Sequence, residues 1–509
     1  MADNPAIQLT MPVGYEEKDL IRKLPGKYAR EGMRHVIVSK SLDARNKPQL
    51  KWVLRIEFVP QDYKFPPHES LVEKASRPVT ATVVGSGPAG FFAAYYLQLA
   101  GLKVRLIEQG KQVEPRAKDI YKFESAGEFT PNGNYSFGEG GAGTFSDGKL
   151  TSRTKNIDAE REFFFRAYLD CGAPEEIAYL NLPHVGSDNL RKIATLLRER
   201  FIAAGGEILF ETKLIDLKRA DGKVAGFETT AGLIESDYYI IASGHSDYST
   251  FRMLIDSGIT FDVKPFAIGS RVEHPQPFIN KARWGREKIE GLKAADYKLA
   301  QSLGERGSVY SFCMCPGGKV VQAAPREGVC VVNGMSYYQR NSPYANSAIV
   351  ASLNLNDFLG KEVGAAEALD WLEALENRFW SYRGSFIAPA ARLADFVEGK
   401  PSSYIPKNTY SHGVESADFR DFFPKRILNT LREGLKAFDK NIRGFVHEGV
   451  LIGLESKTSS PVRARRSESG TAAGFDNLYI VGEGSGYSGG IVSSAADGIR
   501  AAKNLIARL

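Results

Sequence analysis

The stretch that decides the fold reads VTATVVGSGPAGFFAAYYLQLAGL and runs from Val79 to Leu102. It opens with a β-branched run (Thr80–Val84), passes through the glycine-rich segment Gly85–Gly90, and continues as a helical pattern (Phe91–Ala100). Its 24 uncharged residues would be long enough to cross a bilayer. Glycines and a proline interrupt its front part, however, so we interpret it as a buried strand, turn and helix, and we expect no membrane span.

The turn has the spacing GxGxxG, and each of its positions has a physical role. Gly85 allows a tight turn, Gly87 lets the backbone approach a pyrophosphate, and Gly90 lets the helix pack closely on the strand. The first turn of the helix, with Pro88 and Ala89, offers unpaired N–H groups and a positive dipole end to phosphates. The sequence therefore predicts a dinucleotide site at this turn.

An acidic residue ends the next predicted strand, Val104–Glu108, 18 residues after Gly90. Glu108 can accept hydrogen bonds from ribose hydroxyls and would repel a 2′-phosphate. The competing interpretation is a glycine-rich turn that serves packing alone. The agreement of strand, turn, helix and terminal carboxylate favours the bound dinucleotide.

Two further segments favour FAD over NAD as that dinucleotide. Ala242-Ser243-Gly244 ends the apolar strand Tyr238–Ala242 and resembles the "ATG" segment of two-domain flavoproteins. Gly482-Glu483-Gly484 follows the strand Leu478–Val481 and resembles their C-terminal motif, whose carboxylate holds the ribityl hydroxyls. A dehydrogenase that binds only NAD needs neither segment, so we expect FAD as the cofactor.

Longer strings carry a specific family resemblance. They are GEGGAGTFSDGKL (Gly138–Leu150), GSRVEHPQ (Gly269–Gln276), FCMCPGG (Phe312–Gly318), VNGMS (Val332–Ser336), TSSPVR (Thr458–Arg463) and GEGSGYSGGI (Gly482–Ile491), with SLDAR (Ser41–Arg45) nearer the N-terminus. From about Arg77 to Leu509 the chain resembles the uncharacterised FAD-dependent dehydrogenases of the glutathione-reductase-like flavoprotein superfamily, in its two-domain branch. That family has no settled substrate, so the resemblance implies a fold and a cofactor but little chemistry.

The resemblance also implies a set of FAD contacts. The pyrophosphate would lie at Gly85–Gly90, the adenosine ribose at Glu108, Gln109 and Gly110, and the adenine near Leu214. The ribityl chain and ring would meet Gly141, Gly143, Thr144, Phe145 and Ser146, with Lys149 as a nearby cation or, equally, as a solvated lysine. Gly482, Glu483 and Gly484 would meet the ribityl and phosphate groups, and Gly489, Gly490 and Ile491 would begin a helix facing the pyrimidine edge of the ring. The alternative for Gly138–Gly148 is a flexible surface loop; the aromatic and acidic residues among its glycines favour an ordered cradle.

The order of predicted elements indicates an α/β protein: a Rossmann-type FAD-binding domain, an inserted and mainly antiparallel substrate domain, and a small N-terminal α+β domain. We place the N-terminal domain at residues 1–75 and the FAD-binding domain at 76–261 and 441–509. The substrate domain is expected at 262–440, with Tyr337, Tyr338, Arg340 and Asn346 as candidates for its lining.

The composition of the chain limits which binding partners and which cellular location we expect. The 509 residues are 43% hydrophobic and 25% charged, which is typical of a globular protein. The net charge of +6 is spread without a basic cluster, so we expect no nucleic-acid partner. The four cysteines and an N-terminus without a secretory pattern favour a reducing, cytoplasmic location.

Cys313-Met-Cys315 raises the question of a redox pair. Disulfide reductases of this superfamily carry a C-x4-C pair soon after the fingerprint helix, and the sequence has none there. A disulfide within C-x-C would be strained on an extended strand, so we interpret these cysteines as small buried side chains near the ring and keep the redox pair as the lesser alternative. No histidines cluster with Cys330 to form a metal site, and His245, which follows Gly244, is the most interesting of the isolated histidines.

Taken together, these features predict an FAD-dependent oxidoreductase that transfers a hydride between a small-molecule substrate and non-covalent FAD. No second GxGxxG follows a strand in the middle of the chain, so NAD(P)H is expected only as a transient partner at the flavin. We can name no catalytic residue. Two alternatives remain: a flavoprotein that modifies tRNA and a non-catalytic binding protein.

Overall fold

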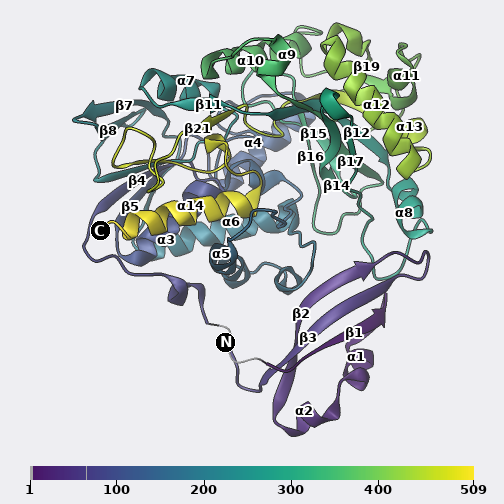
Figure 1. The fold of residues 1–509 in the computed structure, drawn as a ribbon, viewed down its shortest axis with the longest axis horizontal. Helices are drawn as coiled ribbons and strands as arrows, with labels where there is room; N and C mark the ends of the chain where they lie inside the picture. The colour runs from purple at the N-terminus through teal and green to yellow at the C-terminus, as the bar shows by residue number, and fades with distance from the viewer. Residues whose placement is uncertain (1–3, 65) are drawn as a thin grey trace.

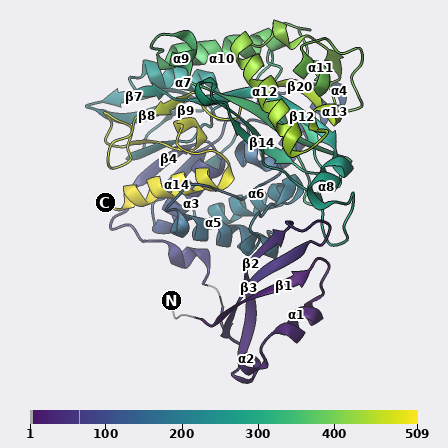
Figure 2. The same ribbon diagram turned by 45° about the vertical axis from the view of Figure 1, so that its right-hand side comes forward.

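The computed structural model describes residues 4–64 and 66–509 (Figure 1). Its N-terminal unit is a three-stranded antiparallel sheet with the order β1-β3-β2, formed by β1 (Ala6–Pro12), β2 (Met33–Asp43) and β3 (Lys51–Pro60). Two short helices, α1 (Glu17–Lys23) and α2 (Gly26–Arg30), lie between β1 and β2. Figure 2 shows this unit at one end of the molecule, below the two larger sheets.

Hydrogen bonds at two places help to join the N-terminal unit to the rest of the described chain, and Leu50 packs into the core of the larger part. The edge strand β2 pairs with the segment at Leu180, since Lys40 N–H donates to the Tyr179 carbonyl and Asn181 N–H donates to the Lys40 carbonyl. At the far end, Lys47 Nζ donates to the Ala282 carbonyl at 2.7 Å. The unit is thus anchored to both larger parts of the protein.

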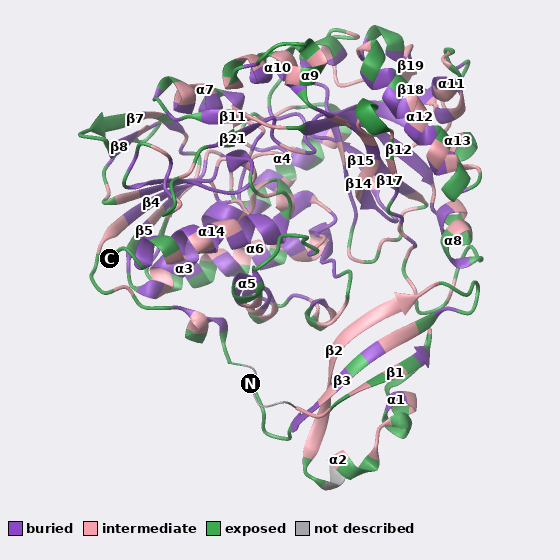
Figure 3. Ribbon diagram, viewed as in Figure 1, coloured by how far each residue is buried: buried purple, intermediate pink, exposed green. Residues whose placement is uncertain are grey.

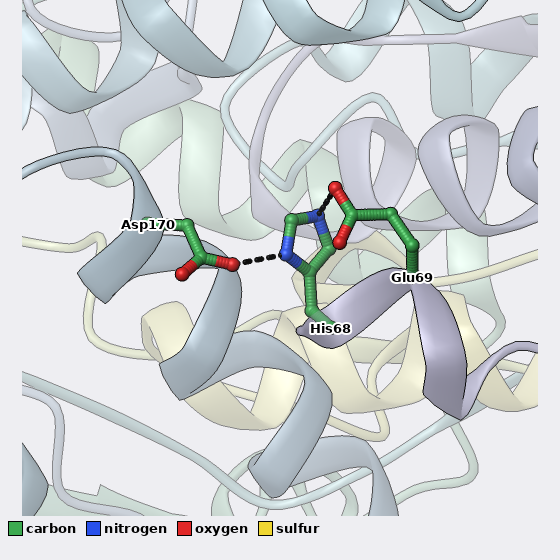
Figure 4. A group of neighbouring side chains, drawn as sticks. All are labelled: His68, Glu69 and Asp170. Carbon is green, nitrogen blue, oxygen red and sulfur yellow. Dashed lines mark hydrogen bonds and ion pairs between the residues drawn. The ribbon is translucent and has the colours of Figure 1, made fainter. Parts of the chain in front are cut away.

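The linker after β3 is fastened by a histidine. Figure 4 shows His68 between Asp170 and Glu69, and the His68 Nε2 atom also lies 2.9 Å from the Tyr95 hydroxyl. The side chain of His68 is fully buried. These three groups have the donor atoms of a metal site, but both imidazole nitrogens already have protein partners, and we interpret the group as a structural anchor of the linker.

The parallel sheet is the Rossmann-type part of the fold. Its order is β22-β10-β4-β5-β6, formed by β4 (Thr80–Val84), β5 (Lys103–Ile107), β6 (Glu207–Leu209), β10 (Tyr238–Ile241) and β22 (Leu478–Ile480), and every neighbouring pair is parallel. The helices α3 (Pro88–Ala100), α14 (Ile491–Ile506), α5 (Asp158–Asp170) and α6 (Gly186–Ala203) pack together beside it. Their inward faces are buried, as Figure 3 shows.

A larger, mainly antiparallel sheet forms from the sequence between β10 and β22. Its order is β13-β14-β17-β12-β20-β18-β19, from β12 (Phe266–Pro275), β13 (Ala300–Ser302), β14 (Ser308–Cys315), β17 (Tyr344–Leu353), β18 (Ala388–Arg392), β19 (Val414–Ser416) and β20 (Val450–Glu455). Only the β18–β19 pair is parallel. The strand β20 lies beyond the predicted end of the substrate domain at residue 440 yet pairs with β12 and β18, so that predicted segment omits one strand of this sheet.

The remaining elements connect and cover the two sheets. The helices are α4 (Val113–Ala126), α7 (Tyr248–Asp256), α8 (Gln276–Trp284), α9 (Leu355–Leu359), α10 (Ala365–Trp380), α11 (Leu393–Glu398), α12 (Lys425–Asn441) and α13 (Phe445–Glu448). The short strands are β7 (Leu214–Ala220), β8 (Lys223–Thr229), β9 (Gly232–Ile234), β11 (Phe261–Val263), β15 (Lys319–Gln322), β16 (Val332–Met335) and β21 (Val462–Ala464). Across the described ranges, we find no helix that combines the length and the apolarity needed to traverse a bilayer.

Candidate functional site

Four predicted segments meet at one edge of the parallel sheet. Gly85 follows β4, Glu108 follows β5, Ala242 follows β10, and Gly482 comes shortly after β22. The carboxyl ends of parallel strands lie at the same edge, where open α/β sheets bind their ligands. Main-chain hydrogen bonds extend the sheet into this edge, from Gly85 N to the Ile107 carbonyl and from Ala242 N to the Val84 carbonyl.

The glycines of the first turn have distinct roles in the structure. Gly85 has φ +94°, and a Cβ there would lie 2.4 Å from the Ala242 carbonyl oxygen. A Cβ at Gly90 would lie 1.9 Å from the Gly85 carbonyl oxygen, so helix α3 could not begin so close to its strand with any larger residue. A Cβ at Gly87 would instead make an ordinary contact, 3.7 Å from the Gly141 Cα. The turn therefore requires glycine at Gly85 and Gly90 for steric reasons, whereas Gly87 leaves the outer surface of the turn free of a side chain.

Two helices begin at this edge without a side-chain cap in the described chain. Helix α3 starts after Gly87, and α14 starts after Gly490, which has φ +87°. Uncapped first turns leave N–H donors and a positive dipole end for an anion or an electron-rich group. The helices cross closely, because a Cβ at Gly498 would lie only 2.0 Å from the Ala89 carbonyl oxygen. Pro88, Ala89 and Ile491 belong to these first turns.

Glu108 joins the segments of this edge. Its Oε2 atom accepts hydrogen bonds from Ser86 N and Ser86 Oγ, both at 2.8 Å, and its Oε1 atom accepts from Gly110 N at 2.9 Å and Gly138 N at 3.1 Å. The side chain is buried. The carboxylate thus fixes the glycine turn against the Gly138 loop, a role that the sequence did not indicate. Its expected contact with a ribose, like those of Gln109 and Gly110, stays a prediction.

The Gly138–Gly148 loop is organised by a buried arginine that sequence reasoning missed. Arg116 of α4 donates to the carbonyls of Asn134, Tyr135, Glu139 and Gly141 at 2.8 to 3.1 Å. Its guanidinium also lies 4.8 Å from the centre of the Phe145 ring, and burial lowers its pKa to about 10. The loop forms a short 3-10 helix, Gly141–Phe145, which contains Gly143 and Thr144 and is followed by its C-cap residue, Ser146. No pattern marked Arg116, since its partners are all main-chain carbonyls distant in sequence.

The turns after β10 and β22 contact each other. A Cβ at Gly484 would lie 2.3 Å from the Gly244 carbonyl oxygen. His245 Nδ1 lies 3.5 Å from Glu483 Oε2, so the histidine and the acidic residue of the two predicted motifs form one group. His245 Nε2 is buried and has no hydrogen-bond partner among residues 4–64 and 66–509.

Open main chain surrounds this group. Within the described part of the chain, no atom lies within 4 Å of an added Cβ at Gly244 or Gly490, and the nearest to one at Gly489 is Glu483 Oε1 at 3.7 Å. Bare glycines and two uncapped helix starts leave room and N–H donors for a dinucleotide, and the unpaired imidazole nitrogen offers one further hydrogen bond. The residues present therefore fit FAD. Ser243 lies in the same turn, and Leu214 begins β7 just after the segment Glu211–Thr212, whose amides bond to the Gly110 and Glu108 carbonyls.

Lys149 is partly exposed and has two protein partners. Its Nζ lies 3.0 Å from Asp147 Oδ2 and donates to the Met314 carbonyl. Asp147 is buried and also pairs with Arg340 at 2.7 Å. Tyr338 lies near this cluster through His184, whose Nε2 contacts the Tyr338 carbonyl at 3.1 Å. The Gly138–Leu150 segment is thus joined to the larger sheet through charged groups.

Behind this cluster lies a fully buried ion pair that the sequence did not single out. Arg271 Nη1 lies 3.1 Å from Glu455 Oε2, and Arg271 Nε donates to Asn346 Oδ1 at 3.0 Å. Asn346, a predicted lining residue, is therefore buried in the sheet between β14 and β12. Burial raises the pKa of Glu455 to about 7, against the lowering effect of Arg271.

A parallel sheet with a glycine-rich phosphate turn, joined to a larger mainly antiparallel sheet, defines a two-domain dinucleotide-binding protein of the flavoprotein type. Residues 265–458 match the family model described as "FAD-dependent protein, C-terminal domain-like", and residues 83–125 match an NAD(P)-binding Rossmann-like domain. A curated protein from Clostridium beijerinckii, named "Uncharacterized protein", is 40% identical over 440 residues, which cover 85% of this chain and 81% of that protein. The chain belongs to this family of FAD-dependent proteins.

The solved structures that match this chain are distant. A geranylgeranyl bacteriochlorophyll reductase-like protein from Thermoplasma acidophilum is 14% identical with a TM-score of 0.36, covering 84% of this chain and 77% of that one. L-proline dehydrogenase from P. horikoshii is 11% identical with a TM-score of 0.35, covering 85% and 94%. Similarity at this level says nothing about the reaction of this chain.

Proposed function

We propose that this protein binds FAD without a covalent bond and is an oxidoreductase that transfers a hydride between FAD and a small molecule. The observation that supports this most is the convergence of four strand ends with two uncapped helix starts, α3 and α14, around the bare glycines Gly87, Gly244 and Gly490. Membership of a family of FAD-dependent proteins favours FAD as the dinucleotide.

Different groups of the chain would bind different parts of the cofactor. The first turn of α3 supplies N–H donors for the pyrophosphate, and Glu483 supplies a carboxylate for the ribityl hydroxyls. The second uncapped start, at Gly490, supplies N–H donors for an electron-rich ring edge. His245 Nε2, buried and without a partner in the described chain, can donate or accept one further hydrogen bond. When bound, FAD supplies an acceptor or donor of two electrons and a proton.

The substrate would enter from the side of the larger sheet. Lys149 and Arg340 place two cations there, and Asp147 holds both in position. Preorganised charges of this kind can orient a polar substrate without further rearrangement. We propose a small-molecule substrate, with NAD(P)H as a transient partner at the same face.

An absorption spectrum of the purified protein tests the cofactor. We expect the two visible bands of oxidised flavin, released as FAD on denaturation. The variant Gly87→Val should lose most of the flavin, because its methyl groups would occupy the bare side of the turn. Gly364→Val is the matched control, since Gly364 has negative φ and no described atom within 4 Å of an added Cβ.

Two results would contradict the proposal that the protein binds FAD. A colourless wild type that cannot be reconstituted with FAD would refute the proposal, as would full flavin retention in Gly87→Val. If flavin is present, anaerobic titration with NADH, NADPH and candidate small molecules should bleach the visible bands with at least one of them. A flavin that no reductant bleaches would leave a binding protein rather than an oxidoreductase.

A further inference from the structure

The segment Cys313-Met314-Cys315 does not continue as a regular strand. The pairing of β14 with β17 shifts register between Phe312 and Cys315, which makes a bulge, and Cys313 has φ +44°. Left-handed backbone is costly for a residue other than glycine and concentrates at functional sites. Contrary to the expectation from the sequence, Cys313 and Cys315 therefore do not lie on a regular extended strand.

The bulge turns the Cys315 side chain towards the main chain of Cys313. Cys315 Sγ donates to the Cys313 carbonyl oxygen at 3.3 Å. Cys315 is fully buried, whereas Cys313 is partly exposed. Cys313 is thus the more accessible residue of the pair.

Two cations flank the pair from different elements. Arg271 Nη2 donates to the Cys313 carbonyl at 2.6 Å and lies 3.6 Å from Cys315 Sγ. On the other side, Lys149 Nζ donates to the Met314 carbonyl. Positive groups beside a cysteine favour the thiolate, which is the nucleophilic form.

The local charge balance has room for a thiolate. The cluster contains the cations Lys149, Arg271 and Arg340 and the carboxylates Asp147 and Glu455, which leaves one positive charge without an anionic partner inside the cluster. The hydrogen bond from Cys315, and then the charges of Lys149 and Arg271, hold the pKa of the Cys313 thiol below its ordinary value, against the effects of burial and of Asp147.

An unpaired donor marks the same place. Asn346 lies directly across from Cys315 in the β14–β17 pairing, and its Nδ2 atom is buried without a hydrogen-bond partner in the described chain. A buried donor that lacks an acceptor in the protein requires an explanation. An anion or a polar group brought by a bound molecule would supply the acceptor.

We propose that Cys313 and Cys315 form a redox-active dithiol that exchanges with disulfides, with Cys313 as the attacking thiolate and Cys315 as the resolving thiol. The Cys313 sulfur attacks a disulfide R–S–S–R, forms a mixed disulfide and releases one thiolate. Cys315 then attacks Cys313 Sγ, its proton passes to the first released thiolate, and the second R–S group leaves as a thiolate. The products are one thiol, one thiolate that takes a proton from water, and the Cys313–Cys315 disulfide, so the substrate is reduced by two electrons and the dithiol is oxidised by two.

This pair would be reversible rather than structural. A disulfide between residues separated by one position closes a small strained ring, and strained disulfides are readily reduced. The proposal depends only on groups of this chain and goes beyond the proposed flavin chemistry. It can therefore be tested whether or not FAD binds.

Trypsin makes the test direct. Cleavage after Arg306 and Lys319 yields the peptide GSVYSFCMCPGGK, which contains both thiols and neither Cys171 nor Cys330. The reduced, folded full-length protein is treated with glutathione disulfide, unfolded, alkylated with N-ethylmaleimide and digested. We expect this peptide to be lighter by two hydrogen atoms and unalkylated, while the peptides of Cys171 and Cys330, both buried, carry the alkyl group.

Variants separate the two roles. In Cys315→Ser, glutathione should remain bound to Cys313, because no thiol resolves the mixed disulfide. In Lys149→Met, alkylation of Cys313 by iodoacetamide in the folded protein should slow by about tenfold, since the thiolate loses a neighbouring cation. Lys149→Arg keeps the charge and should restore most of the rate.

Three results would overturn the proposal. One is a wild-type peptide that carries two alkyl groups after the oxidant. Another is a Cys315→Ser protein without a glutathione adduct on Cys313. The third is an alkylation rate of Cys313 no higher than that of Cys171 in the folded protein, which would make these cysteines the small packing side chains expected from the sequence.

Discussion

Replacing Gly498 with alanine should loosen the contact between α14 and the first turn of α3. The added Cβ would lie 2.0 Å from the Ala89 carbonyl oxygen and 2.8 Å from the Ala89 carbonyl carbon. Both are main-chain atoms, so no flexible side chain can move aside. Ordinary contact needs a separation of roughly 3.5 Å, and the helices must therefore part by about 1.5 Å at this point.

The magnitude follows from two opposing effects. Forcing an extra carbon into a packed contact costs about 3 kcal/mol when the backbone must shift. Alanine in a helix interior gains about 1 kcal/mol over glycine. The net loss in the free energy of unfolding is about 2 kcal/mol. For a domain of about 150–250 residues this corresponds to a fall in Tm of about 4–8 °C.

Thermal unfolding followed by circular dichroism at one fixed scan rate measures this effect. Gly364→Ala is the control, because Gly364 precedes α10 with negative φ and open space in the described structure, and its Tm should move by less than about 2 °C. The flavin content of Gly498→Ala should also fall, since both uncapped helix starts lie at the candidate site. A Tm for Gly498→Ala equal to or above that of the wild type would refute the close crossing of α3 and α14.

Three further substitutions test other parts of the structure. Burial raises the pKa of Glu273 to about 7, although Thr409 donates two hydrogen bonds to it. The carboxyl group of Glu273 therefore binds its proton more tightly in the folded protein than in the unfolded chain. Its contribution to the free energy of unfolding, about 3 kcal/mol at most, is fully present below pH ~4.5 and is lost as the pH rises to about 7. Glu273→Gln should remove this part of the pH dependence in urea unfolding. Lys457→Met should cost about 3–5 kcal/mol in the free energy of unfolding, because Lys457 Nζ lies 2.8 Å from Glu376, which is fully buried and would keep an unpaired charge. His68→Ala should release the linker and speed tryptic cleavage after Lys74 in the folded protein.

Each of these predictions has an outcome that contradicts it. Glu455 also has a pKa raised to about 7, so part of the pH dependence should persist in Glu273→Gln; an unchanged slope would mean that Glu273 titrates normally. The double variant Lys457→Met with Glu376→Gln should recover much of the loss of the single one, and no recovery would argue against a charge effect. Equal cleavage rates after Lys74 in the wild type and His68→Ala would show that His68 does not hold the linker.

The sequence determined the parts of the molecule whose causes are local. The strand, glycine turn and helix from Thr80 to Ala100 could be predicted because their residues are contiguous and each has a steric role. The same holds for the presence of helices and strands in the N-terminal unit and for the helix that begins near Gly490. The parallel order then brings Gly85, Ala242 and Gly482 together, as expected for strands that end in such turns.

Only the tertiary structure decided the features that depend on distant residues. Arg116 binds four carbonyls of the segment 134–141, which starts 18 positions further along the chain, and nothing in its own helix signals this. Gly498 looks like an ordinary helix glycine until α14 crosses α3. The strand β20 joins the larger sheet from beyond residue 440 because its partners, β12 and β18, lie far before it in the chain. Cys313 leaves the extended conformation where β14 bulges against β17, which no local pattern indicates. Local patterns fix what each segment forms, whereas long-range pairing and close packing fix which side chains meet.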